Sequence, residues 1–300
     1  MDDYSIRPLF AVMLNLNSAE DTAASVESLL AADAPEMKIV VVDNGSTDDS
    51  AAVLRARFSG QIELLVSGRN LGFAGGINLG LRHALKCGAA AVLVMNNDTL
   101  VDPAMIRYLS SAAMEHPEAG IFAPAIYDHA RRERLWRLGD RRHRWLPFPL
   151  QIPYHEAARV LVPADYVTGC AMLIRRDVLE RVGLFDEDYF FYFEDADFCG
   201  RARRAGYVIY VAPQARMWHK AAATARRVKP LVRFHRARGQ VMFYRAHPQG
   251  FSRLLTGLYV IAKTLLQAGR DALAGDFTLA AASVRGALDG YRHSRAQRLA

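Results

Sequence analysis

The chain has 300 residues, of which 51% are hydrophobic, and this is enough for one large domain with a sizeable core. Its three cysteines are unclustered and odd in number, which excludes a disulfide-stapled scaffold, and no pair of them has zinc-site spacing. We therefore expect a reducing, cytoplasmic location. The N-terminus lacks the features of a signal peptide, and the longest apolar stretch, Leu254 to Ala268, is too short to span a membrane.

Charge is distributed unevenly along the chain. Residues 226–300 contain fourteen Lys or Arg and three Asp or Glu, which gives this segment a net charge of +11 within a total of +7. The first 225 residues therefore carry −4. We predict a catalytic domain over residues 1–225, followed by a basic segment over 226–300 that meets an anionic surface.

Strand and helix patterns alternate from the start of the chain. Leu9–Leu14 is a continuous apolar run, as expected of a strand that is buried on both faces, and Lys38–Val42 is predicted as a second strand that ends at Asp43. Further strands are predicted at 62–66 and 91–95. A helical pattern runs through Val26, Leu29 and Leu30, and helices are predicted at 50–58 and 73–86. Asp102 and Pro103 then provide an N-cap and a first-turn proline for a helix that ends at Glu115. This rhythm predicts an α/β fold with an open, mostly parallel, twisted sheet and helices on both faces.

The second half of the chain is less regular. Residues 160–175 return to strand character around Thr168 and Gly169, residues 194–204 form a helical pattern, and 207–211 form a short strand. From Arg226 onward the pattern is helical throughout. We therefore expect a C-terminal helical segment behind the α/β domain.

Polar residues gather where the predicted strands end, and ligands of such sheets bind beyond the carboxyl ends of the strands. Asn15 and Asn17 follow the first strand, and Asn96–Asp98 follow the fourth. Asp43, at the tip of the second strand, can accept a hydrogen bond from the imide N–H of uracil or thymine. The alternative is that Asp43 only starts a turn. We favour base binding because of its location.

A glycine-rich segment at residues 68–78 leads into a helix. Glycines let the backbone approach a phosphate, and a helix N-terminus favours anions. However, the segment matches neither the dinucleotide fingerprint nor the P-loop. Close packing of the helix on the sheet explains Gly75 and Gly76 equally well, so this segment alone is a weak signal.

Acidic residues supply the candidate chemistry. Asp98 can ligate a hard divalent cation that bridges nucleotide phosphates, although an ordinary loop role is the better interpretation of this residue alone. Glu194, Asp195 and Asp197 follow four consecutive aromatic residues. Burial there should shift their pKa values, as a general base for a sugar hydroxyl requires, whereas helix capping is the alternative. His219 becomes a candidate metal ligand if it meets Asp98 in space.

These motifs, in this order, resemble the inverting glycosyltransferases of family 2, which have the GT-A fold. Within that family, the chain is most similar to bacterial rhamnosyltransferase-like and galactofuranosyltransferase-like enzymes of cell-surface polysaccharide synthesis. The resemblance covers roughly residues 8–220. It is carried by VVDNGSTDDS, NLGFAGGINLG, VLVMNNDTLVDPAMI and TGCAMLIRRDVLERVGLFDEDYFFYFEDADFCGRARRAGY.

The resemblance implies roles for individual residues. Asp43 would contact the pyrimidine, Asp98 would be the metal-binding end of an Asp-x-Asp element, His219 would complete the metal site, and Asp195 would be the catalytic base. The first Asp of that element is Asn96 here, which weakens metal affinity. Asn15-Leu16-Asn17 lacks the tyrosine that relatives often have between the two asparagines, which puts base stacking there in doubt. The predicted donor-binding set is Asn15, Asn17, Asp43, Asn44, Asn70, Gly72, Asn78 and Asn97.

The implied activity is metal-dependent, inverting hexosyl transfer from a dTDP- or UDP-sugar, with rhamnose favoured, to a saccharide or lipid-linked saccharide. Mn²⁺ or Mg²⁺, held by Asp98 and His219, would neutralise the diphosphate leaving group. Asp195 would remove the proton of the acceptor hydroxyl. Glu194 and Asp197 are assigned to orienting the site and to holding acceptor hydroxyls.

Three other functions were considered. A sugar nucleotidyltransferase would have a glycine-rich loop with a lysine after the first strand, and residues 15–19 contain neither. A non-catalytic polyanion-binding protein could use the arginines and aromatic residues of the C-terminal segment. The apolar residues of that segment have helical spacing, so no nucleic-acid partner is expected. Intact Asp98, Asp195 and His219 argue against a catalytically inactive family member.

One helical face of the C-terminal segment is apolar and is flanked by Arg253, Lys263 and Arg270. Such a helix can lie among lipid headgroups, so we predict a peripheral location on the cytoplasmic membrane face. The alternative is that this face packs on the catalytic domain or on a second copy of the chain. The residues of the face are Leu254, Leu255, Leu258, Ile261, Ala262, Leu265 and Leu266.

Overall fold

The structure is a computed structural model and describes residues 6–34, 36–143, 148–153, 155, 160–220, 229–247 and 253–293. The strands are β1 (Leu9–Asn15), β2 (Lys38–Asp43), β3 (Ile62–Val66), β4 (Ala91–Met95), β5 (Thr99–Val101), β6 (Ala119–Asp128), β7 (Leu135–Arg137), β8 (Asp140–Arg142), β9 (Pro149–Gln151), β10 (Val162–Ala164), β11 (Ala171–Arg175) and β12 (Val208–His219). The helices are α1 (Ala19–Leu30), α2 (Ser50–Arg57), α3 (Gly72–Lys86), α4 (Met105–Glu115), α5 (Arg176–Val182), the 3₁₀ helix η2 (Glu187–Tyr189), α6 (Glu194–Arg204), α7 (Lys229–Ala246), α8 (Arg253–Leu273) and α9 (Phe277–Arg292).

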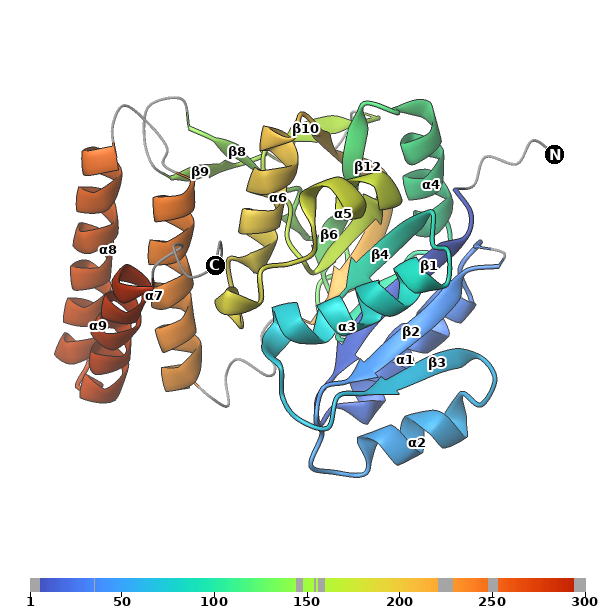
Figure 1. Cartoon of the computed structure of the whole chain (residues 1–300), viewed down its shortest axis with the longest axis horizontal. Coiled ribbons are helices and arrows are strands. Elements are labelled where there is room, and N and C mark those ends of the chain that lie inside the picture. The colour runs from blue at the N-terminus through green and yellow to red at the C-terminus, as the bar shows by residue number, and fades with distance from the viewer. Residues whose placement is uncertain are drawn as a thin grey trace.

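A central sheet organises the fold, with strand order β10-β12-β6-β11-β4-β1-β2-β3 (Figure 1). The strands β3, β2, β1 and β4 are mutually parallel. Next to them, β11 runs antiparallel between β4 and β6, and β12 runs parallel to β6. Residues Phe10 to Met13 of β1 are fully buried, because helices cover both faces of the sheet. The predicted α/β class and the mostly parallel core are confirmed.

The helices form two layers. Helices α1, α2 and α4 pack on one face of the sheet, through residues such as Val26 and Leu54. Helices α3, α5, α6 and α7 pack on the other face, through residues such as Ile77 and Leu81. Helices α1, α3 and α4 bury apolar residues spaced three or four positions apart, such as Val26 and Leu29 of α1.

Three boundaries differ from the sequence-based expectations. Helix α4 begins at Met105, after Asp102 accepts a hydrogen bond from the Ala104 N–H. The strand expected to end at Val211 continues as β12 to His219, because its second half pairs with both β6 and β5 across an irregularity in register. The strand character of residues 160–175 divides into β10 and β11, and Thr168 and Gly169 lie between them.

Helices α7, α8 and α9 form a layer beside α6, on the left of Figure 1. The basic residues of this segment are partly used inside it: Arg233 pairs with Asp271 at 3.0 Å, and Arg245 donates to the Gly290 carbonyl at 3.2 Å. Part of the positive charge is therefore structural. The proposed boundary at residue 225, together with Arg226, Arg295 and Arg298, lies outside the described residues.

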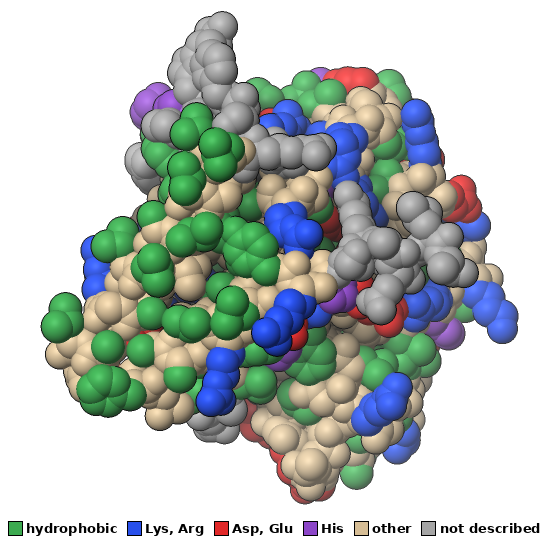
Figure 2. Space-filling model, turned by 60° about the vertical axis from the view of Figure 1, so that its left-hand side comes forward, with side chains coloured by type: hydrophobic (Ala, Val, Ile, Leu, Met, Phe, Trp, Pro, Cys, Tyr) green, Lys and Arg blue, Asp and Glu red, His purple; other side chains and the backbone are tan. Residues whose placement is uncertain are grey.

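Helix α8 turns its apolar face to the solvent. Leu254 is 71% exposed, and the whole face predicted from the sequence is exposed with it, whereas Thr256 and Val260 point inward. Figure 2 shows these hydrophobic side chains gathered over the C-terminal helices. The alternative that this face packs on the catalytic domain is therefore wrong. Within the described part of the chain, no helix has both the length and the apolarity needed to cross a membrane.

Candidate active site

The ends of β1 and β2 are tied together by a polar cluster around Asp43. Its carboxylate accepts hydrogen bonds from the Asn15 amide at 2.8 Å, from the Ser46 hydroxyl at 2.6 Å and from the Ser46 N–H at 3.0 Å. Asn17, next to this cluster, accepts from the Thr47 N–H at 2.8 Å. A carboxylate has about four acceptor positions, so Asp43 retains one for a donor such as a pyrimidine imide.

A second polar cluster lies at the N-terminus of α3. Asn44 accepts from the Leu71 N–H at 3.1 Å and donates to the Gly72 carbonyl at 2.9 Å. Asn70 accepts from the Gly72 N–H at 2.9 Å. Gly72 has φ +73°, and a Cβ there would lie 2.4 Å from the Phe190 carbonyl oxygen. Only glycine fits this close approach, which joins the glycine-rich entry to the segment that precedes the acidic residues.

The residues after β4 connect to β1, α1 and β12. Asn97 donates to the Thr22 hydroxyl at 2.8 Å, and Thr22 donates to Asn15, also at 2.8 Å. Asp98 meets His219, with 3.1 Å between Oδ1 and Nε2, although 120 positions separate them in the sequence. The structure thus satisfies the spatial condition that made His219 a candidate ligand, because β5 and the end of β12 pair directly behind Asp98.

The pair formed by Asp98 and His219 suits a divalent cation. Adjacent ligand atoms of an octahedral ion at the magnesium distance lie roughly 3 Å apart, close to the observed separation. The Nδ1 atom of His219 is buried and has no hydrogen-bond partner among the described residues. The Trp136 ring lies 5.1 Å from the imidazole ring and limits its movement. An oxygen and a nitrogen ligand match Mn²⁺ or Mg²⁺ with further ligands from phosphates.

Asp195 lies at the first turn of α6 and faces the loop before β11. Its carboxylate accepts from the Gly169 N–H at 2.9 Å. Burial raises the pKa of the neighbouring Cys170 thiol well above its usual range, and the charges of Asp98 and Asp195 raise it further. The carbonyl of Cys170, next to Gly169, accepts a hydrogen bond from the Asn96 N–H at 3.0 Å, two residues before Asp98. The candidate base and the candidate metal ligand lie on the same side of the sheet edge.

Glu194 differs from its neighbour. Its side chain is buried, and Oε2 has no hydrogen-bond partner among the described residues. Burial, reinforced by the charge of Asp195, raises the pKa of Glu194 well above the usual 4.5. Glu194 therefore holds a proton more readily than an exposed glutamate does.

The segment between η2 and α6 holds an unusual backbone. Phe190, Tyr192 and Phe193 have φ values of +46°, +71° and +72°, a region that aromatic residues rarely adopt. Two elements hold this segment. The Phe73 N–H of α3 donates to the Phe190 carbonyl at 2.6 Å, and on the other side a Cβ at Gly239 of α7 would lie 2.7 Å from the Tyr192 carbonyl oxygen.

Helix α7 makes further contacts with this strained segment. The Phe190 ring stacks on His235 with centroids 4.7 Å apart, and the Phe193 ring lies 5.7 Å from that of Phe243. Arg238 donates to the backbone carbonyl of Asp188. The helix that follows the catalytic domain therefore supports the backbone on which Glu194 and Asp195 begin.

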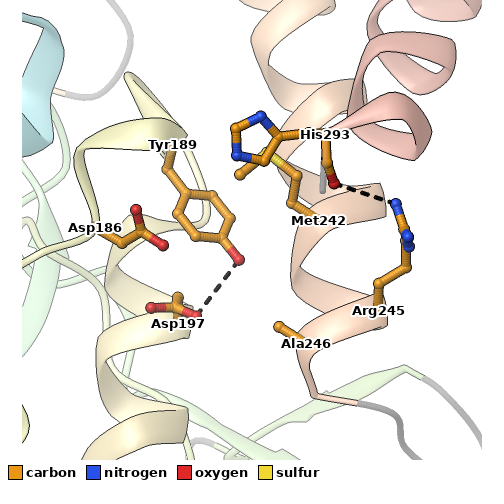
Figure 3. Close-up of a pocket in the computed structure, with 7 residues that line it drawn as sticks. All are labelled: Asp186, Tyr189, Asp197, Met242, Arg245, Ala246 and His293. Carbon is orange, nitrogen blue, oxygen red and sulfur yellow. Dashed lines mark hydrogen bonds between the residues drawn. The ribbon is translucent and has the colours of Figure 1, made fainter. Parts of the chain in front are cut away.

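Asp197 does not join Asp195. Residues two positions apart on a helix point in different directions, and Asp197 pairs with His247 and Arg201, each at 2.7 Å. Figure 3 shows it facing the Tyr189 hydroxyl, which lies 3.5 Å from its carboxylate, beside a cavity of about 130 Å³ between α6 and α7. This position suits orientation of α6, and it does not favour the expected contact with acceptor hydroxyls.

Asn78 also lies apart from the donor clusters. It is buried, its amide nitrogen donates to the Phe185 carbonyl at 2.8 Å, and its oxygen accepts from the Phe185 N–H at 3.0 Å. Both ends of the side chain are thus engaged with the loop before η2. The geometry favours a supporting role over direct contact with a donor.

Three residues near the site were not singled out from the sequence. Gly169 belongs to the matched TGC segment, and its backbone N–H contacts Asp195. Trp136 and Gly239 gave no signal, because their contacts with the site cross between distant parts of the chain.

Comparisons with known proteins support the family that the sequence motifs resemble. A family profile described as "Glycosyl transferase family 2" matches residues 11–183. The N-acetylglucosaminyl-diphospho-decaprenol L-rhamnosyltransferase of Mycobacterium tuberculosis is 31% identical over 212 residues, which cover 63% of this chain and 69% of that protein. The dTDP-rhamnosyl transferase RfbF of Shigella flexneri is 23% identical over 184 residues, which cover 60% and 59% of the two chains.

Among solved structures, the chain is similar to the mannosyltransferase PcManGT from Pyrobaculum calidifontis in complex with GDP-Man and Mn²⁺. The TM-score is 0.57 at 18% identity, and the match covers 97% of this chain and 77% of that one. At this level of identity the likeness shows the fold alone. The expected GT-A fold is confirmed.

Proposed function

Because the chain belongs to glycosyl transferase family 2, we propose that it transfers a rhamnose-like sugar from a dTDP- or UDP-sugar to a hydroxyl of a lipid-linked saccharide, with inversion, in cell-surface polysaccharide or glycolipid synthesis. The names of the two rhamnosyltransferase relatives support this donor, and the decaprenol-linked substrate in one name supports this acceptor class. The observation that carries the proposal is the contact between Asp98 and His219 after β4, next to the loop whose Gly169 N–H binds Asp195.

The donor would lie across the carboxyl ends of β1, β2 and β4. Asp43, held by Asn15 and Ser46, would accept the imide hydrogen of the base. Asn17, Asn44 and Asn97 fix the shape of this surface through the hydrogen bonds described above. Gly72 and Asn70 would let the start of α3 approach the diphosphate, whose charge the helix N-terminus favours.

Asp98 and His219 would hold a divalent cation, Mn²⁺ or Mg²⁺, whose charge would favour departure of the nucleoside diphosphate. Their 3.1 Å separation supports this assignment. Trp136 would keep the imidazole turned toward Asp98.

Asp195 would act as the general base. It would take the proton of the acceptor hydroxyl while the oxygen attacks the anomeric carbon from the face opposite the diphosphate. The bond between that carbon and the phosphate oxygen breaks, and its electron pair leaves with the nucleoside diphosphate. Glu194 is buried beside Asp195, and we assign it to orienting this segment.

The acceptor class gives the exposed face of α8 a role. A lipid-linked acceptor lies at a membrane, and α8 presents a row of exposed leucines with Lys263 and Arg270 exposed on the same helix. We place this face on the anionic cytoplasmic surface of a membrane, with the helix axis in the headgroup plane. A second copy of the chain is the other occupant that such a face could have, and the vesicle assay described in the Discussion separates the two.

A donor screen tests the proposed function. The full chain is incubated with dTDP-rhamnose, UDP-galactofuranose and other nucleotide sugars, with a prenyl-diphosphate-linked N-acetylglucosamine acceptor, and with Mn²⁺ or a chelator. We expect release of nucleoside diphosphate that requires acceptor and metal, and a product of inverted anomeric configuration. Release of pyrophosphate in a separate assay with a nucleoside triphosphate and a sugar 1-phosphate would indicate a nucleotidyltransferase, and retained configuration would overturn the single displacement.

A further inference from the structure

A second cluster of metal-ligand side chains lies at the other end of α3, away from the candidate active site. His83 and Cys87 are four positions apart and therefore lie on one face of the last helical turn. Glu63 of β3 faces them, and one ligand atom from each of the three residues lies within 4.8 Å of the others. The cysteine spacing gave no sign of this cluster, because its partners are a histidine and a strand carboxylate.

This cluster is separate from the site formed by Asp98 and His219. Gly72, at the start of α3, borders the candidate donor clusters, and Cys87 follows the end of the helix. A helix of 15 residues is on the order of 20 Å long. Glu63 is the second residue of the edge strand β3, whereas the active-site residues lie beyond the carboxyl ends of the strands.

The distances suit a tetrahedral ion. Zinc bonds of about 2.3 Å to sulfur and about 2.0 Å to nitrogen place the two ligand atoms roughly 3.5 Å apart. The Cys87 Sγ and His83 Nε2 atoms are 3.7 Å apart. The Glu63 carboxylate contacts the same Nε2 atom, and its side chain is 39% exposed, so it can rotate to become a third ligand.

The surroundings and the ligand types favour a borderline-soft cation. Cys87 is the C-cap of α3, and the negative end of a helix dipole favours positive charge. Thiolate and imidazole ligands select Zn²⁺ over Mg²⁺, Ca²⁺ and Mn²⁺, which prefer oxygen. The cluster of Glu63, His83 and Cys87 would therefore bind a zinc-like ion in preference to Mg²⁺, Ca²⁺ or Mn²⁺.

The geometry points to a second metal site, in which Glu63, His83 and Cys87 bind one zinc-like divalent ion with water as the fourth ligand. Binding releases the Cys87 thiol proton to the solvent as the sulfur–metal bond forms. The ion joins the edge strand β3 to the end of α3. It is independent of the proposed transfer reaction.

Cobalt binding tests this site directly. The full chain is stripped with a chelator, titrated with Co²⁺, and followed by the sulfur-to-cobalt charge-transfer absorption; Zn²⁺ is then added to displace Co²⁺. We expect one equivalent of Co²⁺ to produce the band and Zn²⁺ to remove it. Cys87→Ser should abolish the band, and His83→Ala and Glu63→Gln should each weaken affinity by about 10-fold or more, as loss of even an outer-shell partner does.

His116→Ala is the matched control. His116 and Glu118 form another exposed histidine–carboxylate pair, 3.1 Å apart, and no cysteine belongs to it. This variant should bind Co²⁺ as the wild type does. Zinc should raise the melting temperature of the wild type and not of Cys87→Ser, while both keep equal transferase activity with Mn²⁺. Absence of the band in the wild type, or its survival in Cys87→Ser, would overturn the site.

Discussion

The central sheet and helix α8 are both rich in aliphatic residues, and they use them in opposite ways. In β1, the residues from Phe10 to Met13 are fully buried between two helix layers. In α8, Leu254 and Leu266 are 71% and 64% exposed. The buried strand needs no partner outside the chain, whereas an exposed apolar face of this size marks an interaction surface. The same composition therefore indicates a folded core in one region and a docking surface in the other.

The C-terminal helices are nevertheless connected to the α/β domain, through α7, at the segment that precedes Glu194 and Asp195. Helix α7 contacts Phe190 through His235 and approaches Tyr192 through Gly239. Asp197 of α6 forms a buried pair with His247, just after α7. Removing residues 226–300 would take away these supports together with the surface of α8. Point substitutions therefore distinguish the roles of the two regions better than truncation does.

The largest expected effect is the loss of turnover when the proposed general base is replaced. Asp195→Asn should lower kcat by about 100-fold or more, because a general base contributes about 10² to 10⁴ in rate. Donor affinity should remain unchanged, as measured by nucleotide-sugar binding. Glu194→Gln is the matched control, since glutamine resembles the protonated acid and the pKa of Glu194 is raised. Near-normal turnover of Asp195→Asn would refute the assignment.

The next effect concerns metal binding in the catalytic region. Asp98→Ala and His219→Ala should each raise the Mn²⁺ concentration for half-maximal activity by about 10-fold or more, since even outer-shell changes cost that much. Activity is measured over a Mn²⁺ titration, with Asp33→Ala as an exposed surface control. A variant with the wild-type metal dependence would show that its residue is not a ligand.

A change on α8 should act only on docking. Leu258→Ser combined with Leu265→Ser should reduce binding to anionic vesicles by about 10-fold or more, because full burial of each leucine contributes about 1.5–3 kcal/mol and about 1.4 kcal/mol corresponds to a factor of ten. Co-sedimentation at low and high salt measures this, and transfer to a short water-soluble acceptor should be unchanged. If instead the wild type does not bind vesicles and the variant only converts a dimer to a monomer, the face joins two copies of the chain.

Gly239→Ala examines the contact between the two regions. The added methyl group would press on the Tyr192 carbonyl, and such overpacking costs about 1–3 kcal/mol. We expect a several-fold lower kcat with an unchanged KM for the donor. Gly257→Ala, on the open side of α8, is the control, because nothing lies within 4 Å of a Cβ there. If both substitutions lowered kcat equally, the assignment of a supporting role to α7 would be wrong.

The smallest effect is a pH dependence of stability. The pKa of Glu194 in the folded protein is raised above its usual value of 4.5. As the pH rises above 4.5, Glu194 therefore loses its proton in the unfolded chain before it does so in the folded protein. Wild-type stability then falls with pH from this group, by the linkage between proton binding and unfolding. Glutamine does not titrate, so Glu194→Gln lacks this loss of stability. The free energy of unfolding of the variant, minus that of the wild type, should therefore increase from pH 4.5 to pH 7. Denaturant titrations at both values measure this change.

The sequence predicted most of the sheet and the arrangement of its polar ends. Continuous apolar runs such as Leu9–Leu14 predict buried parallel strands, and polar residues after them must gather at one edge. The extension of β12 to His219 was not predictable, because it depends on pairing with β5 and β6. The positive φ values at Phe190 and Tyr192 could not be predicted either, because packing from α3 and α7 holds these aromatic residues in the left-handed backbone region.

The Phe190 carbonyl has a consequence for chimaeric enzymes. It accepts a hydrogen bond from Phe73, fills the space beside Gly72, and belongs to the segment that α7 supports. A C-terminal segment transplanted from a relative would therefore displace the start of α3 unless it brought residues equivalent to Gly239 and His235. In chimaeras of such enzymes, exchange of the exposed residues of α8 should preserve the fold. A crossover that separates α7 from the aromatic run should disrupt it.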